Sequence, residues 1–169
     1  ALRESETRFR QIFENSGAGI ALYEAVEDGT DFIFKDINPA GALSGLKPRA
    51  EHIGKSVLEV YPGVRDLGLF DVFQEVWRTG VPQHYPSSVY KDERILIWVE
   101  NYVSRLPSGE VMAVYEDVTA RKQAEQSLAV SEERLRLAQE ASLTGVWERN
   151  LKTNDVYWSD NVELLFGMT

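Results

Sequence analysis

An internal repeat constrains the organisation of this chain more than any other feature of its sequence. The stretch SETRFRQIFENSGAGIALYE, from Ser5 to Glu24, aligns without gaps on SEERLRLAQEASLTGVWERN, from Ser131 to Asn150. The identical positions are Ser5, Glu6, Arg8, Arg10, Glu14, Ser16 and Gly19, which match Ser131, Glu132, Arg134, Arg136, Glu140, Ser142 and Gly145. With a shorter loop, FIFKDINPAGALSG also aligns on DVYWSDNVELLFG, which places Gly45 on Gly167 and Leu43 on Leu165. Self-similarity of this extent predicts two copies of one structural unit.

The repeat divides the chain into four expected parts. Residues 1–16 are predicted to form a flanking helix, residues 17–119 a complete domain and residues 120–142 a connecting helix. Residues 143–169 then hold the start of a second copy, without the later strands that would close its core. We therefore expect the chain to be cut from a longer tandem array.

Residues 17–119 contain five segments whose β-branched, aromatic and apolar residues are typical of β-strands. They are Gly19–Val26, Phe32–Ile37, Gln83–Tyr90, Arg94–Leu106 and Glu110–Val118. Several short helical segments separate the second strand from the third. This order predicts an α+β fold, in which a five-stranded antiparallel sheet carries its helices inserted between strands two and three.

Local signals mark where the turns and helices begin and end. The pair Asp28-Gly29 suits a tight hairpin turn with positive φ angles. Asn38 is a favourable N-cap, and Pro39 follows it at the first helical position. The helix LFDVFQEVWRTG is expected to end at Gly80 and to present Phe70, Phe73 and Trp77 on one stripe.

The strand RILIWVENYVSRL carries apolar residues on both of its faces. One face presents Ile95, Ile97, Val99 and Val103, and the other presents Leu96, Trp98 and Tyr102. A sheet of this kind is expected to be covered on both sides. The inserted helices can cover one side, and ETRFRQIFENS, with Phe9, Ile12 and Phe13 on one stripe, is the candidate for the other.

Composition narrows the class of protein. At 169 residues, 43% apolar and 27% charged, the chain is an ordinary globular sequence. No apolar run approaches the ~20 residues of a membrane span, so we expect no direct membrane contact and a cytoplasmic location, although the parent protein can be anchored elsewhere.

The absence of cysteine excludes disulfides, thiolate metal sites and cysteine nucleophiles. A formal charge of −9 argues against nucleic acid as a partner.

The stretch AVYEDVTARKQAEQSL passes from a strand to a helix without Gly or Pro. Thr119 is a favourable N-cap, and Asp117 is an acceptor near the positive end of the helix dipole. Beyond it, small and apolar residues recur at alternating steps of four and three, as in a coiled-coil seam: Ala124, Leu128, Ser131, Leu135 and Ala138. Leu2 and Phe9 repeat the heptad step before the first unit. The pattern predicts a stiff junction and a homodimer through the flanking helices, with a single amphipathic linker helix as the alternative.

The sequence contains no recognisable catalytic constellation. GAGIAL at Gly17–Leu22 lacks the third glycine of a phosphate-binding loop and opens a strand. The acidic cluster Glu24, Glu27, Asp28 and Asp31 is typical of a solvated hairpin tip, and its spacing does not supply the ~6–8 oxygen ligands of a calcium site. We expect no catalytic activity and no metal site in this fragment.

Residues 8–125 resemble the PAS sensor domain family. The motifs that carry the resemblance are DINPAG at Asp36–Gly41, GKSVLEVYP at Gly54–Pro62, VWRTG at Val76–Gly80, WVENYVSRLPSGEV at Trp98–Val111 and DVTARKQAE at Asp117–Glu125. GVWERNLKTNDVYWSDNVELLFG in the second copy resembles the opening of another such domain. The resemblance implies a tandem PAS region of a bacterial-type signal-transduction protein, such as a sensor histidine kinase of a two-component system. A diguanylate cyclase or a phosphatase domain is the alternative downstream effector.

The resemblance implies a signal relay and a small-molecule pocket. Asp117 and Thr119 would join sheet to helix and pass the signal along the seam that contains Leu128 and Leu135 to a downstream effector in the same chain. The pocket would lie between sheet and helices. A cysteine-adduct flavin is excluded because there is no cysteine, and heme is disfavoured because the long helix carries no histidine. The cofactor is left unidentified, and both His52 and His84 are interpreted as structural or surface residues.

Candidate residues of the pocket follow from strand parity and from the helix stripe. They are Phe34, Phe70, Phe73, Trp77, His84, Ile97 and Asn101. Asn101 is a polar residue among apolar ones, so its amide needs backbone, water or ligand as a partner. Our leading hypothesis is a ligand- or redox-sensing regulatory module. The alternative is a domain whose aromatic residues fill the core and which serves only for dimerisation and spacing.

Overall fold

A computed structural model describes residues 2–142, 146–159 and 162 of the chain. The chain divides into two compact units, residues 1–120 and residues 121–169. The division falls within helix α6 (Thr119–Ser142), which is continuous from the end of the first unit into the second. Helix α1 (Leu2–Asn15) and the sheet with its helices belong to the first unit.

The first unit is built on the predicted five-stranded antiparallel sheet. Its strands are β1 (Gly19–Val26), β2 (Asp31–Ile37), β3 (Gln83–Lys91), β4 (Leu96–Arg105) and β5 (Val111–Asp117). They lie in the order β2-β1-β5-β4-β3. The last strand in sequence is therefore the central one, and it pairs with β1 on one side and β4 on the other. The α+β prediction and the strand positions are confirmed.

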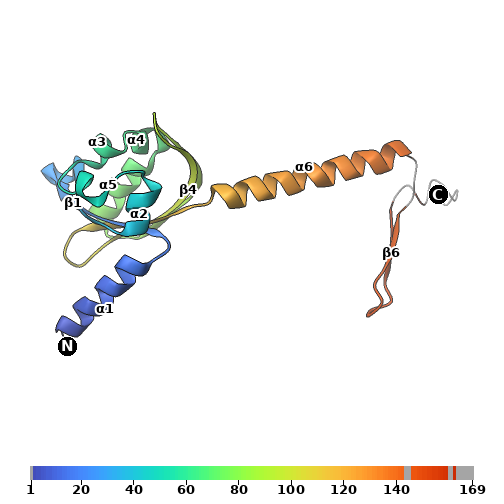
Figure 1. The fold of residues 1–169 in the computed structure, drawn as a ribbon, viewed down its shortest axis with the longest axis horizontal. Helices are drawn as coiled ribbons and strands as arrows, with labels where there is room; N and C mark the ends of the chain where they lie inside the picture. Colours follow the sequence, from blue (N-terminus) through green and yellow to red (C-terminus); the bar gives the residue numbers. More distant parts are fainter. Residues whose placement is uncertain (1, 143–145, 160–161, 163–169) are drawn as a thin grey trace. The chain divides into compact units, whose positions relative to one another are not determined.

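Four short helices and a 3-10 turn lie between β2 and β3, as predicted, and the helices gather on one face of the sheet (Figure 1). They are α2 (Pro39–Ser44), η2 (Arg49–Glu51), α3 (Val57–Val60), α4 (Gly63–Leu67) and α5 (Leu69–Thr79). Gly80 ends α5 with a left-handed φ of 72°. The hairpin between β1 and β2 closes through η1 (Glu27–Gly29), where Asp28 and Gly29 both have positive φ, as expected.

Asn38 fixes the start of α2 and also holds two other segments. Its Oδ1 accepts from the backbone N–H of Gly41 at 2.9 Å and of Ile20 at 2.8 Å. Its Nδ2 donates to the carbonyls of Phe13 at 3.0 Å and Ala18 at 2.9 Å. The amide uses its full hydrogen-bonding capacity in a fully buried position. The predicted N-cap thus joins the end of α1, the start of β1 and the start of α2.

The expectation that α1 covers the second face of the sheet is wrong. Only Phe13 of the three stripe residues is buried; Phe9 is 49% and Ile12 68% exposed. The last turn of α1 is held instead beside the N-cap of α2 through Asn38, and beside η2 through an ion pair of 3.5 Å between Arg49 and Glu14. The outer face of the sheet therefore keeps exposed apolar residues, namely Val89, Leu96, Trp98 and Tyr102.

The second unit contains the rest of α6 and a short hairpin of β6 (Trp147–Arg149) and β7 (Val156–Trp158). The hairpin occupies positions that the repeat aligns with β1 and β2. Gly145, Leu165 and Gly167, which contribute to the alignment, lie outside the described residues. On α6, Leu128 and Leu135 are both 61% exposed. Among the described residues, no helix has both the length and the apolar character that a membrane span requires.

Candidate functional site

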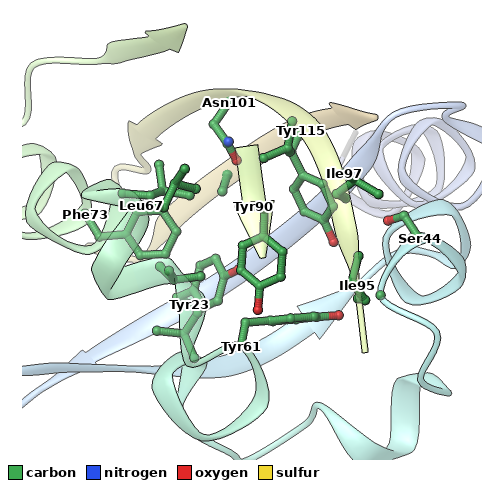
Figure 2. Close-up of a pocket in the computed structure, with 16 residues that line it drawn as sticks. Tyr23, Ser44, Tyr61, Leu67, Phe73, Tyr90, Ile95, Ile97, Asn101 and Tyr115 are labelled. Carbon is green, nitrogen blue, oxygen red and sulfur yellow. The ribbon is translucent and has the colours of Figure 1, made fainter. Parts of the chain in front are cut away.

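A cavity of about 70 Å³ lies between the inner face of the sheet and the inserted helices. Strands β1, β3, β4 and β5 contribute Tyr23, Tyr90, Asn101 and Tyr115, and the helical segment contributes Tyr61 (Figure 2). Most of the remaining wall is aliphatic, from residues such as Val57, Val64, Leu69, Ile95 and Val99. The space exceeds the ~10–15 Å³ needed for one water. It is smaller than the ~300–1,000 Å³ of a site for a drug-sized ligand.

Four tyrosine rings converge on this cavity. Tyr23 packs on Phe73 with ring centroids 5.0 Å apart, and Tyr61 lies edge-on to Tyr90 at 6.1 Å. Burial raises the pKa of all four phenols: well above the usual value for Tyr23, to about 12 for Tyr61, and strongly for Tyr90 and Tyr115. The four hydroxyls therefore stay protonated at neutral pH, and the tyrosines add no charge to the wall.

The hydroxyls of three of these tyrosines have protein partners. Tyr90 donates to Asp92 at 2.8 Å, and the Ser44 side chain holds the hydroxyl of Tyr115. The Tyr61 hydroxyl lies 2.7 Å from Nε2 of His52. These partners fix the rings and leave their faces toward the cavity.

His52 is a buried histidine that does not line the cavity itself but contacts Tyr61, which does. Its Nδ1 lies 3.1 Å from the carbonyl of Pro48, which can only accept, so Nδ1 carries the proton and Nε2 accepts from Tyr61. Burial lowers the pKa of His52 from its usual value of 6.5, which keeps the ring neutral. His52 is thus a structural residue, as interpreted from the sequence, and it positions Tyr61.

Helix α2 approaches the tyrosines closely because one of its residues, Gly41, and its C-cap residue, Gly45, are both glycine. A Cβ at Gly45 would lie 1.7 Å from the hydroxyl oxygen of Tyr61, and one at Gly41 would lie 2.6 Å from that of Tyr115. Real Cβ atoms do not make such contacts. These two glycines therefore allow α2 to form the edge of the cavity beside Tyr61 and Tyr115.

Asn101 is the exceptional polar group of the cavity. It is 2% exposed, and its Nδ2 is a buried side-chain atom without a hydrogen-bond partner in the part of the chain that the structure describes. Asn38 and Asn101 are both buried asparagines, yet the first makes four hydrogen bonds and the second leaves its donor unused. An unpaired buried donor is costly, so its presence at a cavity indicates a site where an acceptor binds.

The structure brings together three of the seven predicted pocket residues. Phe73, Ile97 and Asn101 line the cavity. Phe34 and Phe70 are buried in the surrounding core, and Trp77 packs over Gly29. His84 lies on the outer face, stacked on Tyr102 at 4.4 Å and bonded to Glu100 at 2.8 Å.

A β-bulge explains the position of His84. In a regular strand His84 and Tyr90 would share a face, but the register of β3 shifts between Tyr85 and Ser88. This shift reverses the alternation, so Tyr90 points inward and His84 outward. The four tyrosines were not among the predicted residues. Pairing Asn101 with Tyr115 across β4 and β5 would have identified one of them.

The junction between β5 and α6 is defined by three hydrogen bonds. The backbone N–H of Thr119 donates to Oδ1 of Asp117 at 2.9 Å, and its own Oγ1 accepts from the backbone N–H of Trp98 at 2.9 Å. The N–H of Val118 donates to the carbonyl of Trp98 at 2.8 Å. Strand β4 thus holds the chain up to the first residue of α6.

The donor set of the cavity does not suit the cofactors that the family resemblance raised. The described residues of its wall include neither cysteine nor histidine, so they offer no thiol for a flavin adduct and no imidazole for heme iron. In the described part of the chain, no three residues among His, Asp and Glu form a group that could hold a metal ion. The wall instead suits a molecule held by packing and hydrogen bonding.

Solved structures with the same fold come from sensory proteins. A domain of the sensory box sensor histidine kinase/response regulator from Geobacter sulfurreducens matches with a TM-score of 0.56 and 19% identity, over 69% of this chain and 97% of that domain. The photoactive yellow protein domain of the sensor histidine kinase Ppr from Rhodospirillum centenum matches with a TM-score of 0.54 and 13% identity, over 63% and 91%.

An RNA-binding Light-Oxygen-Voltage receptor matches with a TM-score of 0.58 and 15% identity, over 79% of this chain and 39% of that one. At these identities the matches show the fold alone. A search of curated proteins gave no match. A family model described as PAS fold matches residues 6–123. The chain therefore belongs to the PAS fold family, as the resemblance of its motifs implied.

Proposed function

We propose that residues 17–119 are the sensory module of a larger signal-transduction protein. The module binds a small molecule in the core cavity, and the change passes through the Asp117–Thr119 junction and α6 to a downstream effector such as a histidine kinase. In this proposal the fragment is cytoplasmic and regulatory, has no catalytic role of its own, and forms part of a tandem array whose second PAS copy begins within residues 143–169.

One observation carries the proposal: β4 contributes to both the cavity and the junction. Asn101 faces the cavity with an unpaired donor, and Trp98, three positions earlier on the same strand, holds Val118 and Thr119. A strand is too stiff to absorb a shift over so few residues. A ligand that pulls on Asn101 therefore has a direct mechanical connection to the first residue of α6.

Native mass spectrometry of freshly purified protein tests the binding step. We expect a small-molecule adduct on the wild type that is lost in Asn101→Leu and kept in Tyr102→Leu, since Tyr102 is the adjacent residue on the exposed face. Hydrogen exchange then tests the relay by comparing loaded and stripped protein. The amides of Val118 and Thr119 should exchange at different rates in the two forms, while that of Gly109 in the β4–β5 turn should not change.

A second candidate function is a spacing module that only dimerises through its flanking helices. It is favoured by the exposed seam residues Leu128 and Leu135 and by the uncovered apolar face of the sheet. In the native mass spectra, this module would appear as a dimer without a small-molecule adduct. The hydrogen-exchange rates of the Val118 and Thr119 amides would not change when compounds are added. The two functions therefore give opposite results in one experiment.

A further inference from the structure

The wall of the cavity restricts the kind of molecule that it can hold. Among the described residues that line it, none carries a formal charge at neutral pH, because they include no Asp, Glu, Lys, Arg or His and the tyrosines are protonated. A carboxylate, phosphate or ammonium group placed there would lose its hydration and find no counter-ion. The ligand must therefore be neutral.

The polar groups of the wall restrict the ligand further. The hydroxyls of Tyr61 and Tyr90 are used by His52 and Asp92, and that of Tyr115 is held by Ser44. Nδ2 of Asn101 is the buried side-chain atom without a partner among the described residues. A ligand acceptor satisfies this donor, and most of the remaining wall consists of aliphatic side chains and aromatic rings.

The shape of the wall favours a ring. Tyr23 and Phe73 pack together on one side, and Tyr61 and Tyr90 meet on another, so the cavity is bordered by aromatic faces and edges. Aromatic rings pack well against such surfaces in offset or edge-on geometry. The cavity of about 70 Å³ is smaller than the ~150 Å³ that holds a benzene ring, so a single ring enters only if side chains of the wall move apart, and a fused multi-ring cofactor is excluded.

From these features we infer that the cavity takes a small, uncharged, single-ring compound whose one acceptor oxygen binds Nδ2 of Asn101. This inference rests on the proposed sensory function and names the ligand class for the same site. The acceptor atom of the ligand would then lie next to Asn101 on β4. It would also be close to Tyr115 on β5, because Asn101 and Tyr115 are paired across the two strands.

Three probes of nearly equal shape separate the requirements. Acetophenone is neutral and has one acceptor, isopropylbenzene is neutral without an acceptor, and benzoate is charged. Titration of ¹⁵N-labelled protein is followed by the amide signals of the cavity wall and by the side-chain NH₂ signal of Asn101. Acetophenone should bind about tenfold more tightly than isopropylbenzene, the value of one hydrogen bond, and benzoate should not bind.

Variants assign the contact. Asn101→Leu should bring acetophenone down to the affinity of isopropylbenzene, and Tyr102→Leu should preserve the tenfold difference. Equal binding of the two neutral probes by the wild type overturns the acceptor requirement, and binding of benzoate overturns the neutral site, whether or not the variant folds. Wild-type protein that binds none of the probes, with only a water on Asn101, also overturns the inference.

The outcomes distinguish this inference from the proposed function. Selective acetophenone binding without any change in the exchange of Val118 and Thr119 supports the ligand class and contradicts the relay. In the opposite outcome, the protein binds none of the three probes, but a co-purified small molecule alters the exchange of Val118 and Thr119. This result supports the sensory function and overturns the ligand class.

Discussion

Trp98 and Thr119 are joined by a hydrogen bond of 2.9 Å, in which the backbone N–H of Trp98 donates to the side-chain oxygen of Thr119. The residues belong to different elements, an inner strand of the sheet and the first turn of α6. The carbonyl of Trp98 also accepts from Val118. The helix therefore begins where the sheet ends, without a flexible segment between them.

Thr119→Val removes the acceptor for Trp98 while keeping the shape of the side chain. We expect a loss of about 1 kcal/mol in the free energy of unfolding and faster exchange of the Trp98 amide. Thr119→Ser keeps the hydroxyl and should restore both values. Equal Trp98 exchange in the three proteins would show that the hydrogen bond does not hold the junction.

Substitution by leucine should affect the free energy of unfolding differently at the two buried asparagines, Asn38 and Asn101. Asn38→Leu leaves the N–H groups of Ile20 and Gly41 and two carbonyls without partners. It should lower the free energy of unfolding by about 3 kcal/mol or more, since each abandoned group costs about 1–3 kcal/mol. Asn101→Leu removes a donor that already lacks a partner, so the ligand-free variant should be at least as stable as the wild type.

Urea unfolding of ligand-free protein measures both effects, and each variant is the control for the other. A large loss of stability in Asn101→Leu would mean that the amide of Asn101 already has a partner in solution and does not need a ligand acceptor. A mild effect of Asn38→Leu would mean that α1, β1 and α2 do not depend on the shared cap.

The positions of the elements follow largely from local sequence, because local chemistry determines them. Asn38 and Pro39 start a helix, Gly80 ends one and Asp28-Gly29 turns a hairpin, each through its own backbone preferences. Strand alternation likewise placed Ile97 and Asn101 on the inner face.

Features that depend on long-range contacts could not be predicted in this way. The direction of α1 is decided by Asn38, which binds the carbonyl of Phe13 from a distant part of the chain. The outward position of His84 depends on the bulge between Tyr85 and Ser88. Pro86 within the strand is compatible with a bulge there, but it does not determine by how many residues the register shifts. The tyrosines come from three strands and a helical segment, so only the strand order and the packing of the helices bring them together.

Gly45→Ala should disturb the cavity through Tyr61. The new methyl group would lie 1.7 Å from the Tyr61 hydroxyl oxygen, so the ring must move and its bond to His52 must break. We expect a loss of about 1–3 kcal/mol in the free energy of unfolding. Gly17→Ala is the matched control, because a Cβ there meets nothing within 4 Å. Equal effects of the two substitutions would contradict the close approach of α2 to Tyr61.

The stability of the domain should fall as the pH decreases below about 6.5 because of His52. Burial lowers the pKa of the folded-state ring, so between this lowered pKa and 6.5 the unfolded chain binds the proton more readily than the folded one. The contribution of neutral His52 is therefore complete above pH 6.5 and is lost as the pH falls toward the folded pKa. Urea midpoints from pH 7.5 to 5.5 measure it, and His52→Gln, which cannot titrate, should flatten the slope.

Dimerisation through α6 should depend on the seam and not on apolar surface in general. Leu128 and Leu135 lie on the predicted seam, and Leu137, which is 50% exposed, lies off it. Leu128→Asp and Leu135→Asp would place charges between two helices and should shift the protein to monomer in sedimentation velocity. Leu137→Asp adds the same charge to the same helix and should leave the dimer intact. If all three substitutions have the same effect, or if the wild type is a monomer, the coiled coil is absent, and a relay through α6 would have to act within a single chain.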